Sequence, residues 1–183
     1  MLIANELRRT NIAEYLLYMW QVEDLIRANR FDLDRLSELA SSGMTDESLK
    51  MSVRRWYEEL IGMMIAENVR ERGHLQINDN ILIMLTDLHD RIMESDGCQE
   101  YKQSYYSALP IIVGYRAKSD DTSKGELESC FEFMYGIWML KLQKREISEG
   151  TAEGAQRVSG FLSRLASYYI MERNGELDLD SEE

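Results

Sequence analysis

The sequence is poor in proline, cysteine and histidine. Its 183 residues include one proline, two cysteines and two histidines. Average usage would give roughly nine prolines, and because proline concentrates in turns and loops, its near absence favours long helices with few connections. Cys98 and Cys130 stand alone, without a CxxC spacing. This excludes a disulfide framework and indicates free thiols in a reducing compartment.

The sequence also lacks a long apolar run and an excess of positive charge. Crossing a bilayer takes about 20 consecutive apolar residues, and runs such as 15–20 and 81–85 are far shorter. The N-terminus lacks the apolar stretch of a secretory signal. The 33 acidic and 21 basic residues give a formal charge of −12, which disfavours binding to phosphates. We therefore expect a cytoplasmic protein without a membrane span or a nucleic-acid partner.

Apolar residues recur at intervals of three and four, which is typical of amphipathic helices. The clearest example follows Thr45 and consists of Leu49, Val53, Trp56, Leu60 and Met64. Thr45 can cap the first backbone amides of this helix, and Gly73 is expected to end it. The same spacing continues along the chain, and no alternation of period two competes with it.

The spacing predicts helices over about 11–28, 32–41, 45–72, 78–94, 126–146 and 151–173, and another between Gly97 and residue 118. Pro110 should kink or break the helix that contains it, and 118–125 should be a loop. Asn174 and Gly175 should end the last helix. The predicted fold is all-α, an antiparallel bundle of six to seven helices. It forms a single domain over 1–175, followed by an acidic, disordered tail over 176–183.

Three glycines lie inside predicted helices, at Gly62, Gly136 and Gly160. A glycine inside a helix costs about 1 kcal/mol relative to alanine. We expect a compensating gain, which is usually the close approach of a neighbouring helix.

The two histidines are too few, and their spacing from acidic residues is unsuitable, for the histidine-based metal sites known in helical proteins. A di-iron bundle needs two Glu-x-x-His pairs, and the chain offers only Glu71 with His74, interrupted by Gly73. His89 and Asp90 adjoin as in the His-Asp doublet of helical metal-dependent phosphohydrolases. However, a helix from Asn78 to His89 would rise about 16 Å, so His74 could share the metal only if its loop doubled back.

Carboxylate-based magnesium sites are not supported either. All-helical nucleotide pyrophosphohydrolases hold magnesium with acids one turn apart on two helices. The nearest approaches are Glu67 with Glu71, Glu128 with Glu132, and Glu146 with Glu149, and none is followed by the required second pair. No nucleophile lies beside a base, and no glycine-rich phosphate loop is present. The sequence therefore predicts no catalytic residue, no metal and no cofactor.

Tyrosine and tryptophan are frequent within the predicted helices. Such residues occur in cores, at interfaces and in ligand pockets. In Tyr105-Tyr106 and Tyr168-Tyr169, the two neighbours cannot both face one helix seam, so one of each pair should point outward. We therefore expect a protein-interaction module without catalytic activity that binds a second copy of itself or another protein. The alternative is a helical enzyme or small-molecule-binding protein with an acidic metal site or an aromatic pocket. The pocket would be lined by Trp20, Tyr135 and Trp138.

The opening segment, MLIANELRRTNIAEYLLYMWQVEDLIR, resembles the start of a family of small cytoplasmic bacterial proteins, the domain-of-unknown-function family numbered 4924. The resemblance continues through residues 56–60, WYEEL, and 133–138, FMYGIW. It implies a helical fold. Because that family has no assigned activity, the resemblance transfers no site residue and no function.

Overall fold

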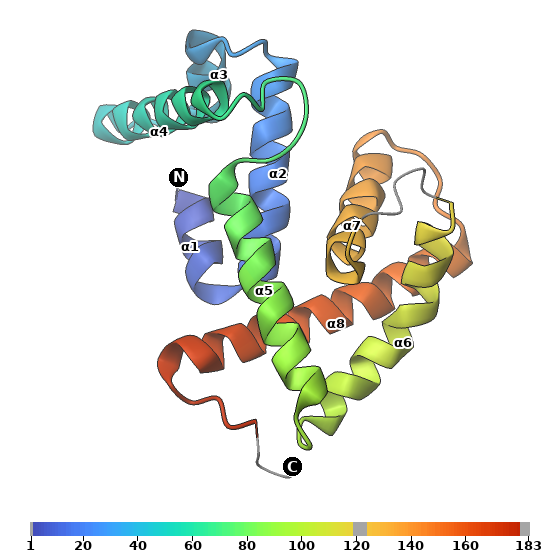
Figure 1. Cartoon of the computed structure of the whole chain (residues 1–183). Helices are drawn as coiled ribbons and strands as arrows, with labels where there is room; N and C mark the ends of the chain where they lie inside the picture. The colour runs from blue at the N-terminus through green and yellow to red at the C-terminus, as the bar shows by residue number, and fades with distance from the viewer. Residues whose placement is uncertain (1, 119–123, 180–183) are drawn as a thin grey trace. The chain divides into compact units, whose positions relative to one another are not determined.

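A computed structural model describes residues 2–118 and 124–179, and in these ranges it contains helices and no strand (Figure 1). The helices are α1 Leu2–Thr10, α2 Ile12–Ala28, α3 Leu33–Ala40, α4 Glu47–Ala66, α5 Gln76–Glu94, α6 Gln99–Arg116, α7 Glu126–Leu142 and α8 Glu149–Asn174. The all-α class is confirmed. The predicted six to seven helices fall short of the eight found in the described ranges, because α1 was missed. The antiparallel bundle stays a prediction.

The chain divides into two compact units. The N-terminal unit comprises Met1–Arg9 and Glu14–Ile81, and the C-terminal unit comprises Thr10–Ala13 and Leu82–Glu183. The single domain predicted over 1–175 stays a prediction. Residues 119–123 of the predicted loop and 180–183 of the predicted tail lie outside the described residues.

Helix α4 ends before the predicted glycine. The backbone of Asn68 is left-handed, with φ of 59°, and its N–H donates to the Ile65 carbonyl at 3.2 Å. The Val69 N–H donates to the Met64 carbonyl at 3.0 Å, which completes a Schellman motif. The prediction that Gly73 ends this helix is therefore wrong, because an asparagine takes the place that glycine usually fills. Asp46 rather than Thr45 provides the N-cap.

The end of α7 also differs from expectation, and Pro110 does not break its helix. Helix α7 ends at Leu142 rather than Glu146, because Lys144 is left-handed and Arg145 N–H donates to Leu140 O at 3.0 Å. Helix α6 runs unbroken through Pro110, so the predicted break is absent, while the predicted kink stays a prediction. Proline removes only one backbone donor, and Pro110 lies on the exposed side of the helix. The prediction for the last helix is confirmed, since Gly175 caps α8 at φ of 72°.

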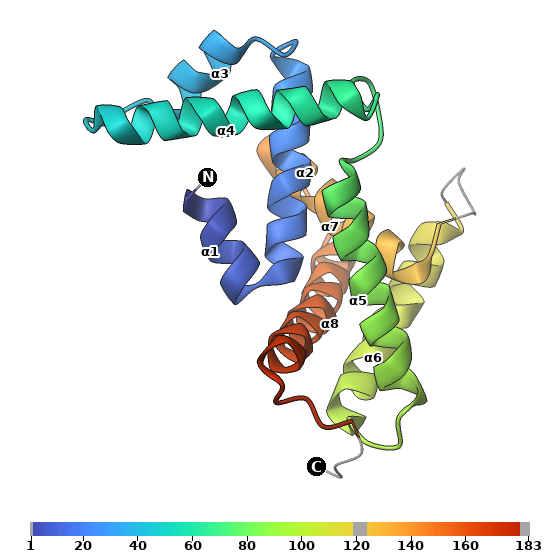
Figure 2. The same cartoon turned by 60° about the vertical axis from the view of Figure 1, so that its left-hand side comes forward.

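In the N-terminal unit, α3 packs along α4 (Figure 2). Asp32 begins α3 by accepting a hydrogen bond from the Arg35 N–H at 3.0 Å. An ion pair between Asp34 and Arg54, at 2.6 Å, joins the two helices on their exposed side. Among the fully buried side chains of this unit are Leu36 and Met64. The amphipathic pattern thus places its apolar stripe inward.

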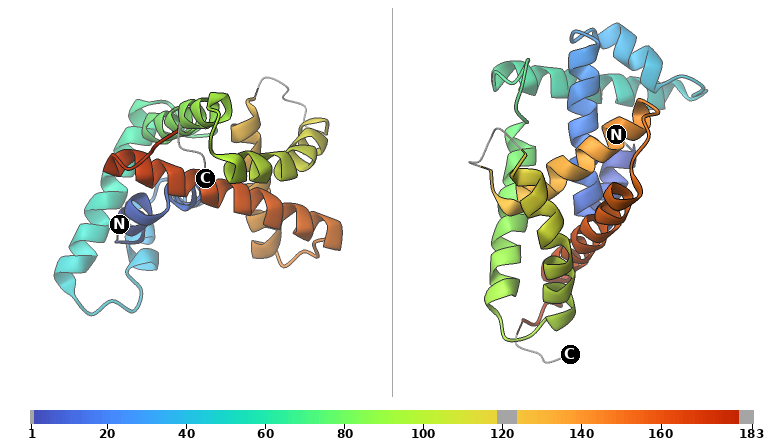
Figure 3. Two further views of the ribbon diagram at one scale, coloured as in Figure 1. Left: turned by 90° about the horizontal axis from the view of Figure 1, so that it is seen from below. Right: turned by 90° about the vertical axis from the view of Figure 1, so that its right-hand side faces the viewer.

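In the C-terminal unit, α6, α7 and α8 pack against one another (Figure 3). A Cβ on Gly154 of α8 would lie 3.1 Å from Cγ2 of Ile111 on α6, so this glycine permits close approach of the two helices. The expectation of close approach at Gly62, Gly136 and Gly160 is wrong, since a Cβ there would meet no atom within 4 Å among the described residues.

None of the described helices is long and apolar enough to cross a membrane.

Candidate functional site

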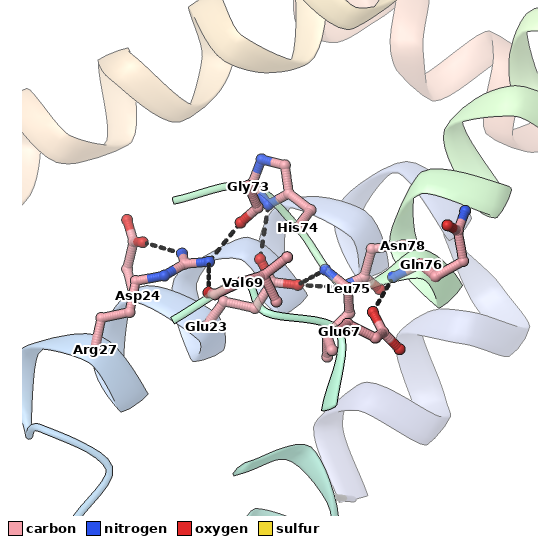
Figure 4. Close-up of polar contacts among 10 residues, drawn as sticks. All are labelled: Glu23, Asp24, Arg27, Glu67, Val69, Gly73, His74, Leu75, Gln76 and Asn78. Atoms are coloured by element: carbon pink, nitrogen blue, oxygen red, sulfur yellow. Dashed lines mark hydrogen bonds and ion pairs between the residues drawn. The ribbon is translucent and has the colours of Figure 1, made fainter. Parts of the chain in front are cut away.

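A buried carboxylate organises the N-terminal unit. Glu23 on α2 is 1% exposed and accepts three hydrogen bonds (Figure 4). The donors are Nδ1 of His74 at 2.7 Å, the backbone N–H of Leu75 at 3.0 Å, and Nδ2 of Asn78 at 2.6 Å. We call Glu23, His74, Leu75 and Asn78 the Glu23 centre. It ties α2 to the loop before α5 and to the first turn of α5.

Neighbouring contacts hold the same loop. The ring of His74 stacks on Trp20, with centroids 4.2 Å apart and planes at 12°. Arg27 donates to the carbonyls of Val69, at 3.1 Å, and Gly73 (Figure 4). A buried charged group that is fully hydrogen-bonded stabilises the arrangement of its donors. The Glu23 carboxylate therefore has a structural role, whereas Oδ1 of Asn78 is buried without a hydrogen-bond partner in the described ranges. His74 is engaged by Glu23 rather than by Glu71.

The second histidine lies in an aromatic cluster of the C-terminal unit. His89 on α5 is 9% exposed, and its Nδ1 lies 2.7 Å from the hydroxyl oxygen of Tyr101 on α6. The rings of Tyr105 and Phe161 stand 4.8 Å and 5.6 Å from the imidazole. Three helices, α5, α6 and α8, thus fix one imidazole in an apolar setting.

Burial changes the acid–base behaviour of this cluster. Desolvation lowers the pKa of His89, although the nearby carboxylates of Asp90 and Glu126 oppose the shift. Burial raises the pKa of Tyr101, and burial together with a hydrogen bond to Glu126 raises the pKa of Tyr105. At neutral pH this places a neutral imidazole between two neutral phenols.

A cavity of about 470 Å³ opens beside this imidazole. Its walls are Thr86, His89, Asp90, Met93 and Glu94 of α5, Tyr105 of α6, and Glu126 and Leu127 of α7. We call it the His89 cavity. It combines an aromatic wall, one imidazole and three carboxylates, and its volume falls in the range of sites for small molecules.

The carboxylates of the His89 cavity differ in whether they form hydrogen bonds and ion pairs with other side chains. Glu126 accepts a hydrogen bond from the Tyr105 hydroxyl and lies 3.7 Å from Nη1 of Arg116. Over residues 2–118 and 124–179, Asp90 and Glu94 form no ion pair. No group of three or more His, Cys, Asp or Glu side chains is arranged to hold a metal ion in the described part of the chain.

The outward side of α6 forms a third feature, which we call the α6 outer face. It consists of Gln103, Tyr106, Ser107, Pro110, Val113, Gly114 and Ala117, all of them exposed. Their spacing of three and four places them on one side of the helix. Tyr106 is 59% and Val113 is 54% exposed. The prediction that one tyrosine of each pair points outward is confirmed for Tyr105 and Tyr106, whereas Tyr168 and Tyr169 are both half-buried.

The aromatic residues proposed for a ligand pocket are divided between the units. Trp20 is buried in the N-terminal unit against His74. Tyr135 and Trp138 lie on α7 with ring centroids 5.6 Å apart. None of the three lines the His89 cavity, and a shared pocket for them stays a prediction.

Sequence reasoning missed Glu23, because its partners lie about 50 positions further along the chain and no local pattern marks them. It also missed the His89 cavity as a site. One signal was present, since Asp90 follows His89 directly and Glu94 lies one helical turn beyond Asp90. Tyr105 and Glu126 join them only through the folding of three helices.

The chain was compared with known proteins. A family model described as a domain of unknown function, DUF4924, matches residues 1–176. The chain belongs to this family. No curated protein and no solved structure matches it. The family model thus covers nearly the whole chain, and its description assigns no activity.

Proposed function

We propose that this DUF4924 member is a cytoplasmic protein-interaction module that self-associates through the α6 outer face. The observation that supports this is an exposed, uncharged helix side. Residues 103–115 contain no Asp, Glu, Lys or Arg, although 30% of the whole chain is charged. Depletion of charge together with exposed Tyr and Val side chains is typical of the centre of a protein interface.

The α6 outer face is complementary to itself. Two antiparallel copies related by a two-fold axis at Pro110 would set Tyr106 of one copy against Gly114 of the other. The same operation pairs Ser107 with Val113, and Gln103 with Ala117. Each pair places a larger side chain against a smaller one and occurs twice, as a closed two-fold interface requires.

Net charge explains why this face suits a second copy. Two chains that each carry −12 repel one another unless their contact excludes charge. The α6 outer face allows contact without burying a carboxylate, which would cost several kcal/mol if it were left unpaired. The two copies can therefore meet here while their acidic surfaces remain in solvent.

Sedimentation equilibrium at micromolar concentration tests the proposal. The wild-type chain should sediment at twice its 21.4 kDa mass. The double variant Tyr106→Glu, Val113→Glu places four carboxylates in the dimer interface and should sediment as a monomer, with a helical circular dichroism spectrum that matches the wild type.

Met51→Glu provides the control. Met51 on α4 is 67% exposed and lies outside the α6 outer face, so this variant should remain a dimer. A wild-type chain that is monomeric at these concentrations contradicts the proposal. Dissociation of Met51→Glu to the same extent as the double variant contradicts the assignment to α6.

A further inference from the structure

We infer that the His89 cavity binds a small organic cation, an aliphatic ammonium compound that also carries a hydroxyl or carbonyl oxygen. This goes beyond self-association, and it assigns a ligand class to residues of α5, α6 and α7.

The acidic lining of the cavity favours a positively charged ligand. Among the described residues, the lining includes Asp90, Glu94 and Glu126 and no lysine or arginine. Glu126 is shared with Arg116, whereas Asp90 and Glu94 have no ion-pair partner in the described ranges of the chain. They lie one helical turn apart on α5 and face the same cavity, so one positive group can interact with both.

Geometry favours an organic cation over a metal ion. A metal ion needs three or more ligand atoms within about 2.0–2.6 Å of a single point. The described residues hold no such group, and the acidic side chains line a cavity of about 470 Å³. A molecule of several heavy atoms can span this space, and Tyr105 adds an aromatic ring to the lining, the kind of group that makes cation–π contacts.

His89 gives the second recognition element. The Tyr101 side chain is completely buried, and Nδ1 of His89 is the acceptor within reach of its hydroxyl. A buried hydroxyl proton is costly to leave without an acceptor, so Tyr101 donates to Nδ1 and the imidazole proton resides on Nε2. The ring lines the cavity, and Nε2 has no protein partner in the described ranges. This N–H therefore donates to an oxygen of the ligand.

Two histidines make the site easy to observe by NMR. The imidazole ring protons give two sets of signals, and the His74→Gln variant identifies those of His89. We expect aminobutanol to shift the His89 signals saturably at about 0.15 M salt, where unspecific attraction to the acidic surface is screened. Butylamine lacks the oxygen and should bind several-fold more weakly.

Two variants matched in charge test the location. Asp90→Asn, Glu94→Gln should weaken aminobutanol binding at least about tenfold. Glu38→Gln, Glu58→Gln removes two exposed acids elsewhere and should leave binding unchanged. Equal weakening in both variants would show unspecific attraction and overturn the site.

Three other results would also overturn the inference. The first is the absence of a saturable shift of the His89 signals. The second is a shift caused by magnesium or manganese ions without one caused by aminobutanol, which would make the cavity a metal site. The third is equal binding of butylamine and aminobutanol, which would show that the ligand oxygen is not recognised and that His89 does not donate to it.

Discussion

His74 and His89 each form a hydrogen bond of 2.7 Å through Nδ1, but their partners differ. His74 contacts the carboxylate of Glu23, which also binds Leu75 and Asn78. His89 contacts a phenol and lines a cavity whose carboxylates include Asp90 and Glu94. In the Glu23 centre, the polar groups serve to join segments of the chain. In the His89 cavity, part of the polar surface is available to a ligand.

The comparison makes a general point about buried charge. A carboxylate whose hydrogen bonds all go to its own chain contributes to stability, and its removal leaves donors without an acceptor. A carboxylate at the wall of a cavity contributes little to stability and can be used for binding. The role of each acid in this chain therefore follows from its partners more than from its position in the sequence.

Removal of the Glu23 carboxylate should have the largest effect. Glu23→Ala leaves His74, Leu75 and Asn78 without their acceptor, and we expect a loss of about 3 kcal/mol or more in the free energy of unfolding. Urea denaturation followed by circular dichroism measures it.

Glu94→Gln is the matched control for that experiment. Glu94 lies at the wall of the His89 cavity and has no ion-pair partner in the described ranges. Its substitution should change the unfolding free energy by no more than about 0.5 kcal/mol. Equal losses of unfolding free energy in the two variants would contradict the difference in role between the Glu23 centre and the His89 cavity.

A smaller effect should appear as a dependence of stability on pH. The pKa of His89 is lowered in the folded protein by burial, so below its ordinary value of 6.5 the unfolded chain binds a proton more readily than the folded chain. The contribution of His89 to stability is therefore intact above pH 6.5. It declines as the pH falls from there toward the lowered pKa.

The measurement is the urea midpoint between about pH 8 and pH 5, for the wild type and for His89→Gln. Glutamine retains an acceptor for the Tyr101 hydroxyl and does not titrate. The wild-type midpoint should fall more steeply than that of the variant, and the difference between the two curves isolates the contribution of His89. Parallel curves would contradict the burial of a neutral imidazole.

Most of the fold could be predicted, because helix formation depends on local spacing. The periodic apolar residues located seven of the helices described, and Gly175 correctly ended the last. The ends of α4 and α7 could not be predicted, since Asn68 and Lys144 adopt the left-handed conformation that normally marks glycine. Helix α1 was missed because its nine residues are fewer than the about 11 or more over which helical spacing becomes evident.

The candidate sites were less predictable, because their members come together only through tertiary packing. One of Tyr105 and Tyr106 could be assigned to the outside, since two adjacent tyrosines cannot share one helix face, and the structure shows that it is Tyr106. Tyr105, which is its neighbour, lies in the His89 cavity with residues of α5 and α7. The Glu23 centre similarly depends on a loop whose path is set by the early end of α4.

Disulfide cross-linking tests the central claim, self-association through antiparallel α6 helices, most directly. Packed helix axes about 8–10 Å apart bring facing Cα atoms within the roughly 4–7 Å that a disulfide spans. The native thiols Cys98 and Cys130 are buried, and burial raises the pKa of Cys130 to about 12, so neither competes. Because the proposed two-fold axis passes at residue 110, Pro110→Cys should form a disulfide-linked dimer under mild oxidation.

Gln103→Cys distinguishes the orientation. In the antiparallel pair the two copies of residue 103 lie about 21 Å apart, so Gln103→Cys should remain uncross-linked by itself but should cross-link when mixed with Ala117→Cys. This pattern on non-reducing gels is the result predicted. A Pro110→Cys chain that stays monomeric, or a Gln103→Cys chain that cross-links to itself as readily, would contradict the account.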